Sequence, residues 1–221
     1  MNIRRIVLPF QQYFRRRRIY LFYKTFSITN RIRILDVGGN SFFWKIAERE
    51  GLILPNVTVL NILPPSEEEL KECSRLGIQW VIGDGRNMPF GDNSFDIVFS
   101  NSVIEHLGDK KSQERFAYEI RRVGKGYWVQ TPNKMFPVEP HLITPFVHWL
   151  PKNFQKNMLR YFTIWGLITK PSKKQCEDFL SEVRLLSLKE MKELFPDAKI
   201  VSEKFFGLSK SLIAIKLISS T

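Results

Sequence analysis

The stretch RIRILDVGGN at residues 31–40 constrains the fold more tightly than any other part of the chain. It begins with a short, largely β-branched apolar run that is typical of a buried strand, formed by Ile32, Ile34, Leu35 and Val37. The acid Asp36 and the glycines Gly38 and Gly39 close this run, and SFFWKIAERE after it predicts a helix. A strand, a glycine turn and a helix N-terminus in this order let the backbone approach a nucleotide-like ligand closely.

Strand-like and helix-like segments alternate along most of the chain. Strands are predicted at 56–62, 78–82, 94–100 and 126–130, and helices at 64–75 and 110–122. This alternation predicts a parallel sheet with right-handed crossovers. Near the C-terminus it stops, because a helix over 177–195 precedes two strands, 199–206 and 211–218, whose short link makes them antiparallel. That ending argues against a dinucleotide dehydrogenase, which continues its βα alternation.

Length and composition bear on the number of domains and on the cellular compartment of the protein. With 221 residues, of which 43% are hydrophobic, the chain is long enough to bury the core of one domain. Its two cysteines, Cys73 and Cys176, are too few for a disulfide framework and favour a reducing, cytosolic setting. No apolar run approaches the roughly 18–20 residues that cross a bilayer. We therefore expect a cytoplasmic protein, with contact to a membrane limited to its periphery.

Positive charge is concentrated at the N-terminus. Residues 1–35 contain nine arginines and lysines and no acid, whereas the net charge of the whole chain is +12. We expect residues 1–30 to form a basic, aromatic leader ahead of a nearly neutral domain at 31–221. Such a leader suits peripheral contact with an anionic membrane. The alternative is a solvated segment that packs a few aromatic side chains against the domain.

The segment at residues 131–171 differs in character from the rest of the domain. It is rich in proline, aromatic residues and lysine, and it follows the predicted strand at 126–130. At about 40 residues it is longer than an ordinary connection, which favours a substrate-shaping lid. The alternative is a helical insertion that only covers an edge of the sheet.

The most specific pattern is GDGRNMPFGDNSFDIVFSNSVIEHL, at residues 83–107. It contains an acid followed by Pro-Phe, then Ser-Phe-Asp at the start of a strand, then Glu-His-Leu, formed by Asp84, Pro89, Phe90, Ser94, Phe95, Asp96, Glu105, His106 and Leu107. With the glycine turn and the closing hairpin, this pattern resembles the class I, seven-stranded S-adenosylmethionine (SAM) dependent methyltransferases, specifically the methyltransferase type 11 group. The resemblance is strongest over residues 31–122. It implies a Rossmann-like α/β fold with a mostly parallel seven-stranded sheet, a C-terminal antiparallel hairpin and helices on both faces.

The resemblance also implies roles for residues at the strand ends. The glycines Gly38 and Gly39 would admit the methionine part of SAM, whose ammonium group suits Asp36. Asp84 would accept a hydrogen bond from the adenine amino group, and the Gly85 amide would donate to a ring nitrogen. Asn61 stands at the ribose-binding position. Ile62 and Met88 would pack on the two faces of the adenine ring, and the backbone carbonyls of Ser100 and Asn101 would lie near the sulfonium. Asp36 has a structural alternative, in which it bonds nearby amides and fixes the turn.

The chain departs from the family's acid-x-Gly-x-Gly-x-Gly pattern. Asn40 and Phe42 stand where later glycines are expected, although asparagine tolerates a left-handed backbone. Asn61 replaces the usual ribose-binding acid, which removes charge assistance worth roughly 1–2 kcal/mol. These changes leave open an alternative function, that of a catalytically inactive methyltransferase-fold binding or scaffold protein.

Two histidines are candidates for a catalytic base, because the pKa of imidazole lies near neutrality. His106 follows the fourth predicted strand, and His141 lies in the proposed lid, where Glu139 is placed to orient it. Packing is an equally strong alternative for His106 and the favoured role for His148. No His, Cys or Asp grouping has metal-ligand spacing, so the sequence predicts no metal.

The methyl acceptor is not readable from the sequence. The basic leader and the aromatic lid favour an amphiphilic acceptor, such as a lipid, a glycan intermediate or another small metabolite. Nucleic acid is not expected as the acceptor. Enzymes that methylate the amino groups of bases have an Asn-Pro-Pro-aromatic motif after the fourth strand, and this chain has SNSVIEHL there.

Overall fold

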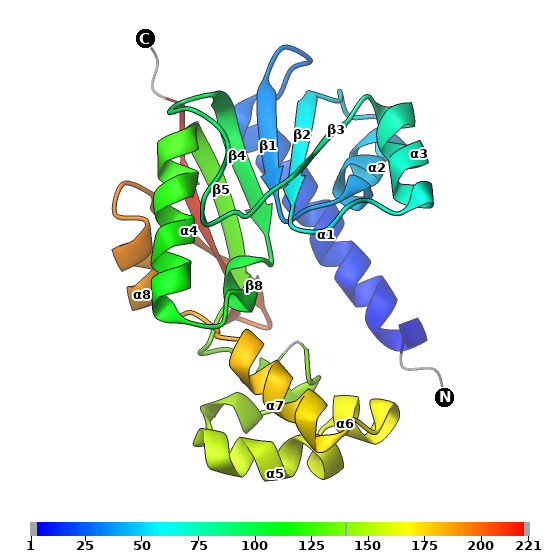
Figure 1. The fold of residues 1–221 in the computed structure, drawn as a ribbon, viewed down its shortest axis with the longest axis vertical. Coiled ribbons are helices and arrows are strands. Elements are labelled where there is room, and N and C mark those ends of the chain that lie inside the picture. Colours follow the sequence, from blue (N-terminus) through cyan, green and yellow to red (C-terminus); the bar gives the residue numbers. More distant parts are fainter. Residues whose placement is uncertain (1–3, 140, 219–221) are drawn as a thin grey trace. The chain divides into compact units, whose positions relative to one another are not determined.

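The protein, seen in a computed structural model that describes residues 4–139 and 141–218, has an α/β fold with a seven-stranded sheet (Figure 1). The strand order is β3-β2-β1-β4-β5-β9-β8. These strands are β1 (Arg33–Val37), β2 (Asn56–Asn61), β3 (Gln79–Ile82), β4 (Phe95–Asn101), β5 (Gly124–Pro132), β8 (Lys199–Phe205) and β9 (Leu208–Lys216). The pairs β1–β2, β1–β4 and β2–β3 are parallel, and β8 and β9 form an antiparallel hairpin. The predicted Rossmann-like fold is confirmed.

The helices connect the strands and form most of the region after β5. They are α1 (Arg4–Phe26), α2 (Ser41–Arg49), α3 (Glu67–Leu76), α4 (Lys110–Val123), α5 (Lys152–Phe162), α6 (Ile164–Thr169), α7 (Lys173–Glu182) and α8 (Leu188–Leu194). Two 3₁₀ turns and a small antiparallel ribbon complete the described elements: η1 (Ile104–His106), η2 (Val147–Trp149), β6 (Val138–Glu139) and β7 (Thr144–Pro145).

The single helix predicted at 177–195 is wrong, because the structure has two helices there, α7 and α8. Ser187 ends the link between them by forming a capping box with Glu190 at the start of α8. The preceding residue, Leu186, is fully buried and forms an isolated bridge with Asn133. Both contacts require extended backbone, which a continuous helix would not provide.

The chain divides into two compact units. Unit 1 comprises residues 1–100, 119–128 and 216–221, and unit 2 comprises residues 101–118 and 129–215. Unit 1 therefore holds β1, β2 and β3 with α1, α2 and α3. Unit 2 holds α5 to α8 and most of the closing hairpin.

Helix α1 is an integral part of unit 1. Its side chains Phe14, Ile19 and Phe22 are almost fully buried, and the ring of Phe22 lies 4.9 Å from that of Phe99 and 5.6 Å from that of Trp128, measured between centroids. Most of the predicted leader at 1–30 is thus a helix that packs aromatic residues into the core; residues 1–3 lie outside the described residues. The membrane contact predicted for the leader stays a prediction.

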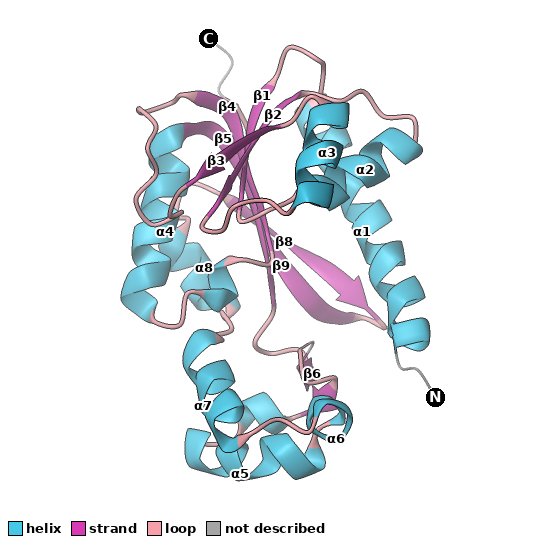
Figure 2. Cartoon of the chain, turned by 45° about the vertical axis from the view of Figure 1, so that its right-hand side comes forward, coloured by secondary structure: helices cyan, strands magenta, loops and turns pink. Residues whose placement is uncertain are grey.

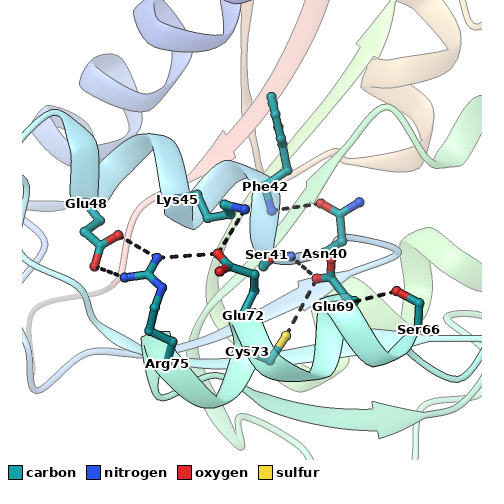
Figure 3. Close-up of polar contacts among 10 residues, drawn as sticks. All are labelled: Asn40, Ser41, Phe42, Lys45, Glu48, Ser66, Glu69, Glu72, Cys73 and Arg75. Carbon is teal, nitrogen blue, oxygen red and sulfur yellow. Dashed lines mark hydrogen bonds and ion pairs between the residues drawn. The ribbon is translucent and has the colours of Figure 1, made fainter.

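Helices α2 and α3 lie side by side and are joined by polar side chains (Figure 3). The Glu69 carboxylate of α3 accepts a hydrogen bond of 2.5 Å from the Ser41 amide at the start of α2. Farther along, Arg75 of α3 pairs with Glu48 of α2 at 2.7 Å, and Lys45 of α2 pairs with Glu72 of α3 at 2.9 Å. These contacts fix the position at which α2 begins, directly after the glycine turn.

In unit 2, helices α5, α6 and α7 lie close together (Figure 2), and they contribute to a small apolar cluster. The buried members of the cluster are Leu142, Val147, Leu159 and Cys176, and Trp165, Phe179 and Leu180 cover it. In the part of the chain that the structure describes, every helix is too short or too polar to cross a membrane.

Candidate cofactor site and histidine cluster

The carboxyl ends of β1, β2 and β3 are tied together in unit 1. The Gly38 amide donates to the Leu60 carbonyl at 2.8 Å, and the Gly83 amide donates to the Asn61 carbonyl at 2.9 Å. Between them, Nδ2 of Asn61 donates to the Gly39 carbonyl at 3.0 Å. Because the three strands are parallel neighbours, the loops after them meet at one edge of the sheet, where α/β proteins commonly bind ligands.

The predicted glycine turn follows β1. Gly38 has φ +73°, a left-handed conformation that most side chains disfavour. A Cβ atom at Gly39 would overlap the Asp36 carboxylate, so the close approach of the turn to this acid requires glycine. Asn40 then caps α2, because its side-chain oxygen accepts from the Phe42 amide at 3.0 Å. The turn therefore survives without the later glycines of the family pattern.

Asp36 lies beneath the turn with only 2% of its surface exposed. Its carboxylate accepts a hydrogen bond of 2.9 Å from the indole nitrogen of Trp44 on α2. Burial raises the pKa of Asp36 to about 7, and the Trp44 hydrogen bond only partly opposes this shift. These contacts favour the structural alternative, in which Asp36 holds the turn in place. The predicted direct contact between Asp36 and the methionine ammonium group stays a prediction.

Asn61 uses both ends of its amide inside the protein. While Nδ2 donates to Gly39, Oδ1 accepts from the Leu63 amide at 3.2 Å. An ionised carboxylate accepts hydrogen bonds but donates none, so the usual ribose-binding acid would lose the bond to Gly39. An amide can make both contacts, and an ionised carboxylate can make only the second. The next residue, Ile62, is 67% exposed and offers an apolar surface beside it.

Asp84 follows β3 and is held by its neighbour Arg86. The guanidinium Nη2 lies 2.7 Å from Oδ2, and the Arg86 amide donates to Oδ1 at 2.8 Å. The hydrogen bonds from Arg86 lower the pKa of Asp84, so its carboxylate is ionised near neutral pH. Gly85 lies in the turn between them. Asp84 remains accessible to a ligand, since 38% of its side chain is exposed.

The other predicted cofactor residues are less accessible. Met88 is 4% exposed, and its backbone amide donates to Glu119 at 2.7 Å. Glu119 in turn pairs with Arg122, a brace under the loop after β3 that sequence reasoning missed because it comes from α4. Ser100 is fully buried and donates to the Val37 carbonyl at 3.1 Å. Asn101, the last residue of β4, belongs to unit 2.

A cluster of two histidines and two acids lies within unit 2, and we call it the histidine cluster: Glu105, His106, Glu139 and His141. Glu105 and His106 lie in η1, whereas Glu139 ends β6 and His141 follows it closely. The two imidazole rings are 4.9 Å apart between centroids. Nδ1 of His141 lies 2.6 Å from Oε1 of Glu139, as the sequence predicts for an orienting acid.

The acids of the histidine cluster are buried and set the electrostatics of the rings. Glu139 is 2% exposed and also accepts from the Leu142 amide at 2.5 Å. Burial lowers the pKa of His141 while the Glu139 hydrogen bond raises it, and the net shift is upward. Burial and the nearby His141 lower the pKa of His106. The predicted role of either ring as a proton acceptor stays a prediction.

The sequence did not indicate that these groups converge. Glu105, His106 and His141 each offer one atom that could ligate a metal ion, a carboxylate oxygen or a ring nitrogen. These three atoms all lie within 4.8 Å of one another, although His141 is far from the other two along the chain. Spacing rules detect ligands in one local segment and miss those that the fold brings together. His148 lies apart from this grouping, with Nε2 3.0 Å from the Lys134 carbonyl and its ring beside Trp149, as expected for a packing residue.

Comparison with known proteins finds a family match over part of the chain. Residues 35–126 match the family described as a methyltransferase domain. Over 97 residues the chain is 30% identical to 2-methyl-6-phytyl-1,4-hydroquinone methyltransferase 2, chloroplastic, of Oryza sativa subsp. japonica. That match covers 43% of this chain and 28% of the rice protein, so the chain spans less than a third of this relative.

Solved structures share the fold at low sequence identity. A SAM-dependent methyltransferase from Methanosarcina mazei is 17% identical with a TM-score of 0.51, over 90% of this chain and 98% of that one. Phosphoethanolamine N-methyltransferase 2 of Haemonchus contortus, solved with S-adenosyl-L-methionine, is 16% identical with a TM-score of 0.53, over 83% and 37%. Residues 35–126 thus match the methyltransferase domain family, and the chain shares the fold of solved SAM-dependent methyltransferases.

Proposed function

We propose that the protein is a SAM-dependent methyltransferase whose unit 1 binds the cofactor at the ends of β1, β2 and β3. The observation that carries the proposal is the edge at which these strand ends are joined, with the glycine turn, Ile62 and Asp84 on neighbouring loops. The residues present fit the cofactor. Gly38 and Gly39 provide backbone free of Cβ atoms, exposed Ile62 provides an apolar surface, and ionised Asp84 provides an acceptor.

Each of these residues has a binding role in the proposal. The glycine turn admits the methionine part of SAM, and Asp36 keeps the turn in place from below. Asp84 accepts from the adenine amino group, while Ile62 packs on the ring. When bound, SAM supplies a methyl group on an already activated sulfonium. The protein's main contribution is then alignment of the acceptor, which lowers barriers by about 7–11 kcal/mol in well-oriented reactions.

The alternative of a catalytically inactive binding protein has one specific observation in its favour. Both ends of the Asn61 amide are engaged within the protein, at the position where the family uses a carboxylate for the ribose. Without a carboxylate that binds the ribose hydroxyls, the chain lacks one source of affinity for the cofactor. The two functions differ in whether the chain binds SAM or its product.

Calorimetric titration of S-adenosylhomocysteine into the full chain tests the proposal. We expect binding in the micromolar range, and an Asp84→Ala variant should weaken it at least tenfold by removing the adenine contact. The matched control is Asp92→Ala, which removes an exposed acid that pairs with Arg122. Wild-type protein that binds no product would favour the inactive scaffold. Equal affinities for the two variants would contradict the assignment of Asp84.

For the acceptor, we propose an amphiphile presented at an anionic lipid surface. The rice relative is named for a phytylated hydroquinone, which supports an acceptor of this kind. Residues 142–176 contain six lysines and arginines and no acid. In the same segment a set of large apolar side chains is 45% to 68% exposed: Phe146, Trp149, Phe154, Tyr161, Phe162, Leu167 and Ile168. A surface that combines exposed aromatic residues with cations suits the boundary of an anionic membrane.

Sedimentation with vesicles tests the membrane proposal. The full chain should bind vesicles of mixed phosphatidylglycerol and phosphatidylcholine, and more weakly as the salt concentration rises. A Phe162→Ser/Leu167→Ser double variant should reduce binding severalfold. Phe206→Ser is the matched control, because Phe206 is 89% exposed but lies in the β8–β9 turn. Equal binding by both variants, or binding to neutral vesicles alone, would overturn the proposal.

A further inference from the structure

We propose that Glu105, His106 and His141 in unit 2 bind a divalent transition-metal ion. Two imidazoles and one carboxylate are a common ligand set for Zn²⁺ and for Fe²⁺, Mn²⁺ or Co²⁺, and three protein ligands leave coordination positions open. The proposal goes beyond methyl transfer and does not depend on it, because every group involved lies within unit 2.

The geometry is close to what an ion requires. The three ligand-type atoms lie within 4.8 Å of one another. An ion about 2.0–2.2 Å from each ligand needs its ligand atoms about 3.0–3.5 Å apart, so a closure of at most about 2 Å completes the site. His106 is the most exposed of the three residues, whereas buried Glu105 fixes one side of the site.

His141 is already oriented as a metal ligand would be. Its Nδ1 is engaged by the Glu139 carboxylate at 2.6 Å, which leaves Nε2 for an ion. Such carboxylate–histidine–metal arrangements fix the tautomer and the direction of the ligand ring. Glu139 is itself held, because its other carboxylate oxygen accepts from the Leu142 amide. The support therefore extends one layer beyond the three ligands.

Glu105 is held by two separate segments of unit 2. Its Oε2 accepts from the Thr131 hydroxyl on β5 at 3.0 Å, and its carbonyl accepts from the Arg184 amide at 2.7 Å. The fully buried Gln113 side chain donates to the carbonyls of Ile104 and Arg184, at 2.9 Å each, and so ties η1 to the link after α7. Rigid support of this kind is what a bound ion needs and what a surface cluster of acids lacks.

The rival explanation is an internal ion pair, in which His141 is a protonated imidazolium beside Glu139 and its Nε2 carries a proton in place of a metal. An ion bound at His106 and His141 would occupy nitrogen lone pairs that a proton-accepting base also needs. Metal binding and the predicted base role are therefore competing uses of the same two rings, and direct measurement of metal binding separates them.

Cobalt binding tests the proposal on the intact, chelator-treated chain. Co²⁺ titrated into wild-type protein should give visible d–d absorption bands that saturate at one ion per chain. Zn²⁺ added afterwards should abolish the bands. His106→Ala and His141→Ala should each remove the bands or weaken binding at least tenfold. Glu139→Gln should weaken binding about 10–100-fold, as the loss of an orienting partner does at other metal sites.

The matched control is His148→Ala, which removes a histidine of unit 2 that lies outside the histidine cluster. This variant should bind Co²⁺ as the wild type does. His106→Ala keeps the result interpretable if His141→Ala unfolds, because His106 is exposed and its circular dichroism melt should match that of the wild type. Absence of bands in wild-type protein, or bands that survive in both His106→Ala and His141→Ala, would overturn the proposal. Product binding by calorimetry reports on unit 1 separately, so failure of either proposal leaves the other testable.

Discussion

Asn61 shows how the amide of a single side chain can join the loops that follow two neighbouring strands. Its Nδ2 holds the Gly39 carbonyl and its Oδ1 holds the Leu63 amide, so one side chain joins the ends of β1 and β2. The sequence shows that the family's acid is missing, but it does not show where the amide donates. The partner lies 22 residues away and becomes visible only in the fold.

We predict that Asn61→Asp destabilises the protein. The carboxylate cannot donate to Gly39, and the lost hydrogen bond should lower the free energy of unfolding by about 1–2 kcal/mol. Urea denaturation at neutral pH measures this. The control is Asn56→Asp at the other end of β2, where Nδ2 makes an exposed hydrogen bond to Asn30 and the loss should be smaller. Equal stability of Asn61→Asp and wild type would contradict the bracing role.

Asp36 makes stability depend on pH. Burial raises its pKa to about 7 in the folded protein, above the ordinary value of 3.8, so the folded state favours the protonated acid. The stabilisation is complete below the ordinary pKa and is lost as pH rises through about 7. Between about pH 5 and about pH 8, the wild type should lose roughly 2–3 kcal/mol of unfolding free energy through this group.

Asp36→Asn should flatten that dependence, because asparagine keeps an oxygen for the Trp44 indole and does not ionise. Urea unfolding of both proteins at the two pH values gives the comparison. A variant whose stability falls with pH as steeply as that of the wild type would show that another group is responsible.

At the scale of elements, α1 shows the limit of reading charge along a sequence. Its arginines and aromatic residues suit a membrane surface, yet Phe14, Ile19 and Phe22 lie in the core of unit 1. Arg16 and Tyr20 both contact Glu50 at the end of α2, each at 2.8 Å. The apolar pattern was visible in the sequence, but the aromatic partners, Phe99 and Trp128, come from distant strands.

We predict that Phe22→Ala costs unit 1 about 3–5 kcal/mol of unfolding free energy, as large-to-small changes of buried aromatic residues do. Leu21→Ala is the matched control on the same helix. Leu21 is 38% exposed, so its truncation should cost much less. Thermal or chemical unfolding compares the two. If both variants unfold like the wild type, α1 is not part of the cooperative core.

The contacts between α2 and α3 in Figure 3 predict that Glu69 contributes more to the free energy of unfolding than its neighbour Glu68 does. Glu69→Ala leaves the Ser41 amide without its carboxylate at the start of α2 and should cost about 1–2 kcal/mol. Glu68→Ala, in the same exposed first turn of α3, should cost only about 0.3–1 kcal/mol through the helix dipole. Chemical unfolding of the two variants measures the difference. Equal losses would mean that Glu69 does not brace α2.

At the scale of the whole molecule, the sequence was most informative where structure is local. The strands, the glycine turn and the closing hairpin follow from β-branched runs, glycines and a short link, and all are confirmed. The break between α7 and α8 was missed, because it depends on a capping box and on a bridge to distant Asn133. The convergence of His106 and His141 was missed for the same reason, since their proximity depends on contacts between segments far apart in the chain.

The account depends on one claim about the molecule, that the joined ends of β1, β2 and β3 hold an adenosyl cofactor. A crystal structure of the full chain with S-adenosylhomocysteine tests it most directly. We expect the methionine part of the ligand against the Gly38–Gly39 turn, the adenine ring on Ile62 and its amino group on the Asp84 carboxylate. A ligand bound elsewhere on the chain, or crystals soaked at saturating concentration that show an unliganded edge with the turn intact, would contradict the claim.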